Sequence, residues 1–177
     1  EDRIIAALGA VDAKISDDKA ERIAETRRLM AEGTPLIYHA YFQKGDLRGE
    51  PDLLERVEHP SAFGTFAYIP SDIKNSTVWE KRKEPTPKEK FLLQLSAYAE
   101  LLEDAQGWWP ETGKIIDSSG TPNVLDLASY RATYEENRRR LDRIRAGEEP
   151  TVPGWKGECG ACQWQAVCVR ALEEADD

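Results

Sequence analysis

Three strand-like stretches follow one another in the first half of the 177-residue chain, and they restrict its fold more than any other feature. Residues 35–42 are rich in Ile, Tyr and Phe, and the Gly45-Asp46 turn separates them from a second stretch at residues 48–58. A third stretch, residues 65–75, follows a segment that contains a proline and a glycine. Because such short turns join antiparallel neighbours, the pattern predicts a three-stranded antiparallel meander.

Helices are predicted on both sides of these strands. Residues 17–32 and 88–104 place apolar residues at helical spacing, and a glycine follows soon after each segment. The apolar stripes are Ala20, Ile23, Thr26 and Met30 in the first segment, and Leu92, Leu95, Ala99 and Leu102 in the second. Residues 1–8 are typical of a helix end, residues 114–117 of a further short strand, and residues 126–146 of a long polar helix. This order predicts a mixed α/β (α+β) domain.

The composition is that of a globular domain. Hydrophobic residues make up 40 % of the chain and charged residues 32 %, and no apolar run approaches the roughly 18 residues that span a bilayer. The chain shows no signal peptide and begins with Glu1, so we expect a cytoplasmic protein fragment whose beginning is missing. The net charge of -9 argues against a protein that coats polyanions non-specifically. A nucleic-acid enzyme is still compatible with it, because a divalent-metal site must itself be acidic.

Two carboxylates and a lysine are predicted to meet at the ends of the second and third strands. Asp72 and Lys74 are two residues apart in a strand, so they project from the same face, roughly 6–7 Å apart. A meander could bring Asp52, in the preceding strand, beside Asp72. Carboxylates in this arrangement can hold Mg²⁺ or Mn²⁺, and a lysine can orient a water or stabilise charge on a phosphate. Asp-x-Lys alone also occurs as ordinary solvated residues at a strand edge.

Gln94 and Tyr98 add a polar pair on the helix that follows. They are four residues apart, so both face the same way, and we expect them to point at the carboxylate end of the sheet and not into the hydrophobic stripe of this helix. An amphipathic helix with a tyrosine at the boundary of its core would give the same spacing.

The order of these residues resembles the PD-(D/E)xK nuclease superfamily, and more narrowly its RecB-like branch. A carboxylate in one strand, Asp-x-Lys in the next and Gln-x-x-x-Tyr in the following helix carry the resemblance, together with RGEPDLL at residues 48–54 and LQLSAYAELL at residues 93–102. The combination is typical of RecB-like nucleases that are often joined to a superfamily 1 helicase, and it covers nearly the whole chain. The resemblance implies a restriction-endonuclease-like core, in which a three-stranded antiparallel meander and a further strand are flanked by helices.

The three cysteines, Cys159, Cys162 and Cys168, lie within ten residues of one another. This clustering favours a metal centre over a secreted disulfide framework, which would use an even number of cysteines spread along the chain. Buried structural thiols would be the plain alternative. Zinc and an iron–sulfur cluster would each need a fourth ligand, and the two histidines, His39 and His59, are far away in the sequence.

The resemblance implies further ligands. RecB-like nucleases with a four-iron four-sulfur cluster have three cysteines at this spacing after the nuclease motifs and a fourth before them, so the fourth is expected upstream of Glu1. In such proteins the cluster clamps the two chain ends together, and residues 151–177 would form this C-terminal segment after a nuclease core at residues 1–150. Glu1 resembles the remnant of the first-helix motif that supplies an additional metal ligand.

The predicted function is hydrolysis of DNA phosphodiester bonds by a Mg²⁺- or Mn²⁺-dependent (exo)deoxyribonuclease. Asp52 and Asp72 would hold the metal, and Lys74, Gln94 and Tyr98 would assist catalysis. Single-stranded DNA or DNA with free ends would be the substrate, a helicase domain or subunit the partner, and repair, recombination or defence the setting, with no membrane involved. Two alternatives stay open: an inactive nuclease-fold module that binds DNA or supports assembly, and a zinc-stabilised structural domain.

Overall fold

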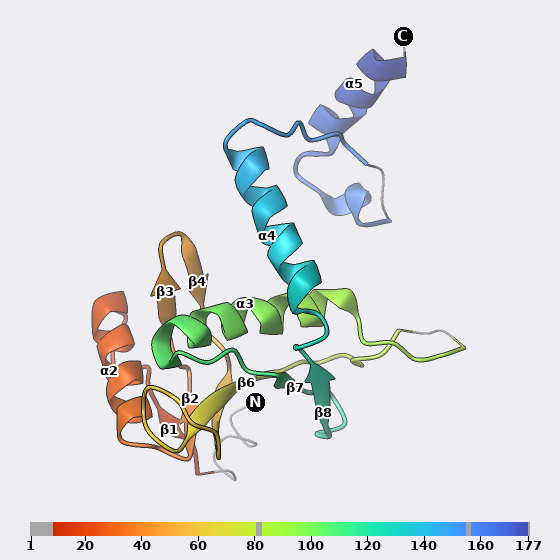
Figure 1. The fold of residues 1–177 in the computed structure, drawn as a ribbon. Coiled ribbons are helices and arrows are strands. Elements are labelled where there is room, and N and C mark those ends of the chain that lie inside the picture. The colour runs from red at the N-terminus through yellow and green to blue at the C-terminus, as the bar shows by residue number, and fades with distance from the viewer. Residues whose placement is uncertain (1–8, 81–82, 155–156, 177) are drawn as a thin grey trace. The chain divides into compact units, whose positions relative to one another are not determined.

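The computed structural model describes residues 9–80, 83–154 and 157–176, so the helix end and metal ligand predicted at residues 1–8 lie outside the described residues. The chain divides into two compact units, residues 1–134 and 135–177. The first unit contains the sheet and the helices that pack on it (Figure 1). The boundary predicted at residue 150 stays a prediction.

Six of the described strands of the first unit form a mixed sheet with the order β1-β2-β5-β6-β7-β8, and β3 and β4 form a separate two-stranded sheet. The meander consists of β2 (Leu36–Tyr38), β5 (Leu53–Val57) and β6 (Ala67–Ile73), each antiparallel to the next. Parallel pairings add β1 (Val11–Asp12) beside β2 and β7 (Thr112–Ile116) beside β6, and β8 (Pro122–Asp126) pairs antiparallel with β7. The predicted α/β fold class and the meander are therefore confirmed.

Two predicted strands are each divided in the structure. The stretch at residues 35–42 ends as β2 and restarts as β3 (Phe42–Lys44), because His39 adopts a positive φ of 54° that interrupts extended backbone. The stretch at residues 48–58 was predicted as one strand, which is wrong. Its beginning is β4 (Leu47–Gly49), which forms a hairpin with β3, and β5 starts only after Pro51, which has no N–H to donate to a sheet.

Helix α2 (Lys19–Ala31) begins where the Asp18 carboxylate accepts hydrogen bonds from the backbone N–H groups of Ala20 and Glu21. The chain leaves this helix through Gly33, which has a positive φ of 71°. The predicted apolar stripe is partly wrong. Ala20 is exposed, and Arg22 and Leu29 are buried beside Thr26 and Met30. The arginine is buried because its charge is paired inside the domain.

Helix α3 (Glu89–Gln106) crosses the same face of the sheet as α2 and closes the core (Figure 1). Ile37, Leu54 and Tyr68 of the sheet pack against Leu101 of α3 and Met30 of α2. A second cluster joins the N-terminal half of α3 to β7 and β8. Burial of these side chains is the main force that holds both helices on the sheet.

The buried Gln106 side chain fixes the position of α3 along β6. The Gln106 amide accepts a hydrogen bond from the Tyr68 N–H at 2.8 Å and donates one to the Tyr68 carbonyl at 3.0 Å. Tyr98 is eight residues before Gln106 in the helix, which is about 12 Å, and Asp72 is four residues after Tyr68 in the strand, which is about 13 Å. Tyr98 and Asp72 therefore lie at about the same position along β6.

The second unit contains most of α4 (Arg131–Arg145), a 3₁₀ turn at Gly157–Ala161 and α5 (Gln165–Asp176). The helix predicted from residue 126 begins only at Arg131, because Asp126 ends β8 and its carboxylate accepts a hydrogen bond from the Ser129 N–H at 3.0 Å. In the described part of the chain, no helix is long and apolar enough to cross a membrane.

Candidate active site

The register of β5 and β6 brings Asp52 beside Asp72. Leu53 pairs with Ser71, so Asp52, directly before β5, lies opposite Asp72. The Ile73 N–H donates a hydrogen bond of 2.6 Å to the Asp52 carboxylate, which fixes this side chain against β6. Side chains alternate between the two faces along a strand, so Asp52 shares a face with Leu54 and Asp72 shares a face with Tyr68. Leu54 and Tyr68 pack in the core cluster with α3, so both aspartates project toward the side that carries α3.

Asp72 and Lys74 form an ion pair at the end of β6, as their spacing predicts. Asp72 is only 2 % exposed, and its Oδ2 atom contacts the Lys74 ammonium but has no well-oriented hydrogen bond from any described residue. The backbone N–H of Lys74 donates a hydrogen bond to the Ile116 carbonyl of β7 at 2.8 Å, which fixes the backbone from which the Lys74 side chain extends. The result is a buried carboxylate that is paired with the Lys74 ammonium and has one oxygen without a well-oriented hydrogen bond from the described residues.

The Asp52 carboxyl has an unusual pKa. Burial is the largest cause that raises this pKa to about 6, and the negative charge of Asp72 raises it further, while the Ile73 N–H and the Lys74 charge act to lower it. Two neighbouring carboxylates that repel each other when both are ionised are a typical cation site, because a divalent ion removes the repulsion.

We expect Asp52→Asn to raise the melting temperature of the metal-free protein at pH 7 by about 2–4 °C, the change that about 1 kcal/mol produces in a domain of this size. The pKa of Asp52 is higher in the folded than in the unfolded state, so the folded protein binds more protons between about pH 4 and pH 6. Its stability therefore falls as the pH rises through this window, and water at the half-buried carboxyl limits the size of the effect.

Thermal unfolding in EDTA from pH 4 to pH 7 measures this difference. The melting temperatures of the variant and the wild type should converge near pH 4. Asp104→Asn, the same change on the exposed surface of α3, serves as the control and should give no such trend. A wild-type advantage at pH 7 would contradict the expected direction.

Gln94 and Tyr98 lie at the helix side of this site. The Tyr98 hydroxyl donates a hydrogen bond to the Glu50 carbonyl at 3.2 Å, and the Gln94 amide donates one to the Tyr98 oxygen at 2.8 Å. Burial, and then the charges of Asp72, Asp52 and Glu50, raise the pKa of Tyr98 to about 12 although the Gln94 hydrogen bond opposes this, so the phenol remains a donor at neutral pH.

The Tyr98 ring differs from the expectation in one respect. We expected this side chain outside the hydrophobic stripe, but the residue is 9 % exposed and its ring packs in the core cluster with Leu95 and Ala99. Its hydroxyl reaches Glu50, in the segment between β4 and β5 that leads to Asp52. The close approach needs Gly49, because a Cβ there would lie 2.9 Å from the Tyr98 ring and 2.6 Å from Leu101.

Two residues near the carboxylates were missed by the sequence analysis. Glu50 binds Tyr98 through its carbonyl, and its carboxylate forms an ion pair with Arg22 of α2. The position of Glu50, two residues before Asp52, could have indicated that it lies near the carboxylates. Arg22 gave none, since an arginine on a polar helix is normally solvated.

A divalent cation of the Mg²⁺ type fits this donor set. Asp52 and Asp72 provide carboxylate oxygens, and Mg²⁺ is commonly bound through one or two carboxylates, with water and phosphate oxygens completing its shell. Among the described residues, no group of three or more His, Cys, Asp and Glu side chains could hold a metal ion. A site here would therefore depend on ligands beyond the described side chains.

The cysteines are not brought together as expected. Cys159 lies in the 3₁₀ turn, Cys162 is exposed just after it and Cys168 lies within α5, and the three form no disulfide bond with one another. In the described part of the chain they belong to no group of three or more side chains that could hold a metal ion, so the metal centre stays a prediction. Backbone hydrogen bonds, such as that from the Cys162 N–H to the Cys159 carbonyl at 3.1 Å, set the local path.

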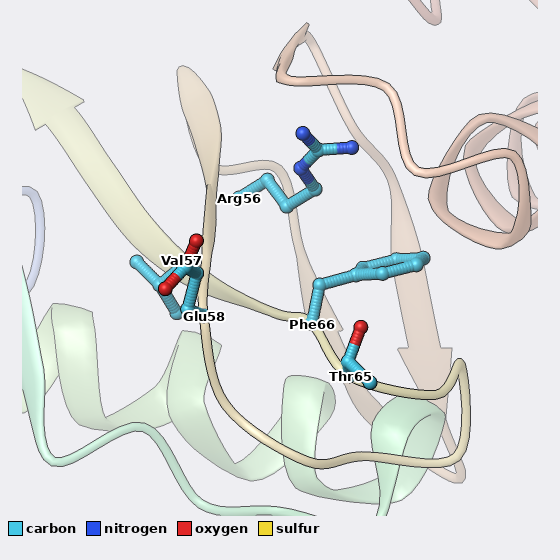
Figure 2. Close-up of a pocket in the computed structure, with 5 residues that line it drawn as sticks. All are labelled: Arg56, Val57, Glu58, Thr65 and Phe66. Atoms are coloured by element: carbon cyan, nitrogen blue, oxygen red, sulfur yellow. The ribbon is translucent and has the colours of Figure 1, made fainter.

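A cavity of about 580 Å³ lies at the opposite end of the β5–β6 hairpin (Figure 2). It is lined by Arg56, Val57, Glu58, Thr65 and Phe66. The guanidinium group of Arg56 is already hydrogen-bonded to the Gly33 carbonyl and lies over the Phe66 ring. The cavity is therefore separate from Asp52 and Asp72, and the Arg56 guanidinium in its wall already has partners within the domain.

Comparison with known proteins identifies the family. A search of curated proteins gives no match. A family model described as the PD-(D/E)XK nuclease superfamily matches residues 6–169, which include the aspartates, the lysine and α3. Members of this superfamily are usually nucleases that use Mg²⁺ or Mn²⁺ and act on DNA. The match covers most of the chain and agrees with the mixed sheet and its flanking helices, so the chain belongs to the PD-(D/E)XK nuclease superfamily.

Proposed function

We propose that this chain is a Mg²⁺- or Mn²⁺-dependent deoxyribonuclease of the RecB-like type. The observation that carries the proposal is the meeting of Asp52, Asp72 and Lys74 at one end of β5 and β6. The RecB-like assignment is supported by Gln94 and Tyr98, which lie on the next helix and reach the same segment.

The catalytic roles follow from the chemistry of each group. Asp52 and Asp72 would hold the cation, which when bound would supply a water of lowered pKa and neutralise charge on the phosphate. Lys74, oriented by Asp72, carries a positive charge to the phosphate oxygen on which negative charge develops. The neutral Tyr98 phenol and Gln94 support the Glu50 carbonyl and thereby hold Asp52 in place.

The substrate and setting extend this proposal. We expect single-stranded DNA or DNA with free ends to be cleaved, with exonuclease action, by a cytoplasmic protein that works beside a helicase in repair, recombination or defence. Support for these details comes from the sequence motifs around residues 48–54 and 93–102.

A cleavage assay tests the proposal. The full chain is incubated with end-labelled linear and with circular single-stranded DNA, each with Mn²⁺, with Mg²⁺ or with EDTA. Cleavage of the linear substrate that EDTA abolishes supports the nuclease. DNA binding without cleavage in either metal would favour the inactive nuclease-fold module instead.

We further propose that Cys159, Cys162 and Cys168 bind a four-iron four-sulfur cluster with a fourth cysteine supplied from outside these residues. Their spacing supports this proposal, although their arrangement does not form a complete site. We expect anaerobically purified full-length protein to be brown and to contain about four irons per chain.

Metal analysis of variants tests the cluster. Cys162→Ser should release the iron and loosen the C-terminal segment, because ligand binding is coupled to folding. Gln163→Ser, beside it on the exposed surface, should retain the iron. A colourless protein with one stoichiometric zinc would replace the cluster with the zinc alternative.

A further inference from the structure

Arg22 of α2 is a charged side chain that is held inside the domain. The residue is only 7 % exposed, and its guanidinium group lies over the Tyr41 ring at 4.9 Å. A buried guanidinium is unfavourable unless its charge and its N–H groups are satisfied. Its partners therefore indicate what the residue is for.

The partners of Arg22 lie on two separate backbone segments. One is the Glu50 carboxylate, which receives hydrogen bonds from both terminal nitrogens of the guanidinium group, one of them 3.2 Å long. The other is the carbonyl oxygen of His39, which accepts a hydrogen bond of 3.1 Å. A lysine could not make this fork of contacts, because its ammonium is a single point of charge.

Both of these segments are directly connected to Asp52. The His39 N–H donates to the Asp52 carbonyl at 3.2 Å, and Glu50 is two residues before Asp52 and receives the Tyr98 hydroxyl on its carbonyl. His39 is the one described non-glycine residue with a positive φ, a backbone conformation that is unfavourable for a residue with a Cβ and needs support from its surroundings. Arg22 gives that support from the helix side.

We propose that Arg22 is a positioning residue, which fixes Asp52 for cation binding by bridging His39 and Glu50. The inference rests on the proposed function for its role in cleavage. The bridge itself is a property of the metal-free fold. Groups that orient metal ligands typically change metal affinity 10- to 100-fold when removed.

Metal-free amide exchange measured by NMR is the first test. In Arg22→Ala, exchange of the His39 and Ile73 amides, which hold Asp52, should accelerate about tenfold or more. The Tyr68 amide on the same strand β6, held by Gln106, should keep its rate. Equal acceleration of all three amides would mean a general loss of stability and would overturn the proposal.

Calorimetric titration with Mn²⁺ alone is the second test. We expect the dissociation constant to rise 10- to 100-fold in Arg22→Ala and by less in Arg22→Lys, which keeps the charge and guards against a variant that fails to fold. Arg28→Ala is the matched control, because Arg28 is an exposed arginine on the same helix that pairs with Glu25 and Glu32. An unchanged constant in Arg22→Ala overturns the proposal.

A double-mutant cycle shows whether Arg22 acts through Glu50. The Arg22→Ala/Glu50→Ala variant should bind Mn²⁺ no more weakly than the worse single variant, whereas additive losses would overturn the bridge. In the cleavage assay, the half-activating Mn²⁺ concentration should rise with the dissociation constant. A wild type that binds Mn²⁺ with this dependence on Arg22 but cleaves no DNA overturns the proposed nuclease and supports the bridge. A wild type that binds no Mn²⁺ overturns both.

Discussion

Asp72→Asn is expected to reduce metal-dependent DNA cleavage by about 10³-fold or more, the upper range for loss of one electrostatic stabiliser. The change removes a negative charge and one cation ligand while keeping the shape of the side chain. Asp72 is almost fully buried and its Oδ2 atom has no well-oriented hydrogen bond in the described structure, so asparagine fills the same space without a large loss of packing.

The measurement is the initial cleavage rate of linear single-stranded DNA in Mn²⁺, with the melting temperature in EDTA as a check of folding. Removing the charge of Asp72 also removes one cause that raises the pKa of Asp52, so the metal-free variant should remain folded. Asp104→Asn on exposed α3 is the control and should cleave at the wild-type rate. Activity of Asp72→Asn near the wild-type level would exclude this carboxylate as the cation ligand.

Lys74→Met should lower the maximal cleavage rate by about 10²-fold while Mn²⁺ binding is retained. The ammonium is held by the Asp72 carboxylate and by a backbone fixed to β7, so its charge is oriented before substrate binds. Methionine keeps much of the length and apolar stem of lysine but cannot supply a charge to the phosphate.

Single-turnover cleavage at saturating Mn²⁺ gives the rate, and calorimetry gives the affinity for the metal. Lys19→Met, an exposed lysine at the start of α2, makes the same chemical change away from the site and should leave both unchanged. A Lys74→Met variant that loses Mn²⁺ binding but recovers its full rate at high Mn²⁺ would assign the lysine to metal binding instead of catalysis.

Local sequence patterns predicted the elements that depend mainly on contacts between chain neighbours or that have a strongly periodic apolar pattern. Helix α3 was expected at residues 88–104 and is found at Glu89–Gln106, because a long apolar stripe and the Gly107 end signal act over adjacent turns. The antiparallel meander was also predicted correctly. Strands β5 and β6 follow each other in the chain, so their pairing could be identified from order alone, whereas β2 and β5 pair although the β3–β4 hairpin separates them in the chain.

Strands β1 and β8 were missed, whereas β7 (Thr112–Ile116) was expected as a short strand at residues 114–117. Strand β1 depends on a partner distant in the chain, and β8 pairs with its chain neighbour β7. Strand β1 has two residues and exists through its parallel pairing with β2, and β8 begins with a proline and pairs with β7 at an edge of the sheet. Neither has a period-two apolar pattern that a sequence can reveal. The divisions at His39 and Pro51 likewise reflect the change of pairing partner between the small hairpin and the main sheet.

From residue order alone, Asp72 and Lys74 could be placed on one face, because alternation along a strand is a property of the backbone. The order of the acidic, Asp-x-Lys and Gln-x-x-x-Tyr motifs also indicated the family. Three long-range features could not be predicted from local patterns: Asp52 lies against the Ile73 N–H, Tyr98 reaches the Glu50 carbonyl, and a buried Arg22 joins the segments around Asp52. These contacts join residues 17 to 48 positions apart, and they form because burial of the core brings α2 and α3 onto one face of the sheet.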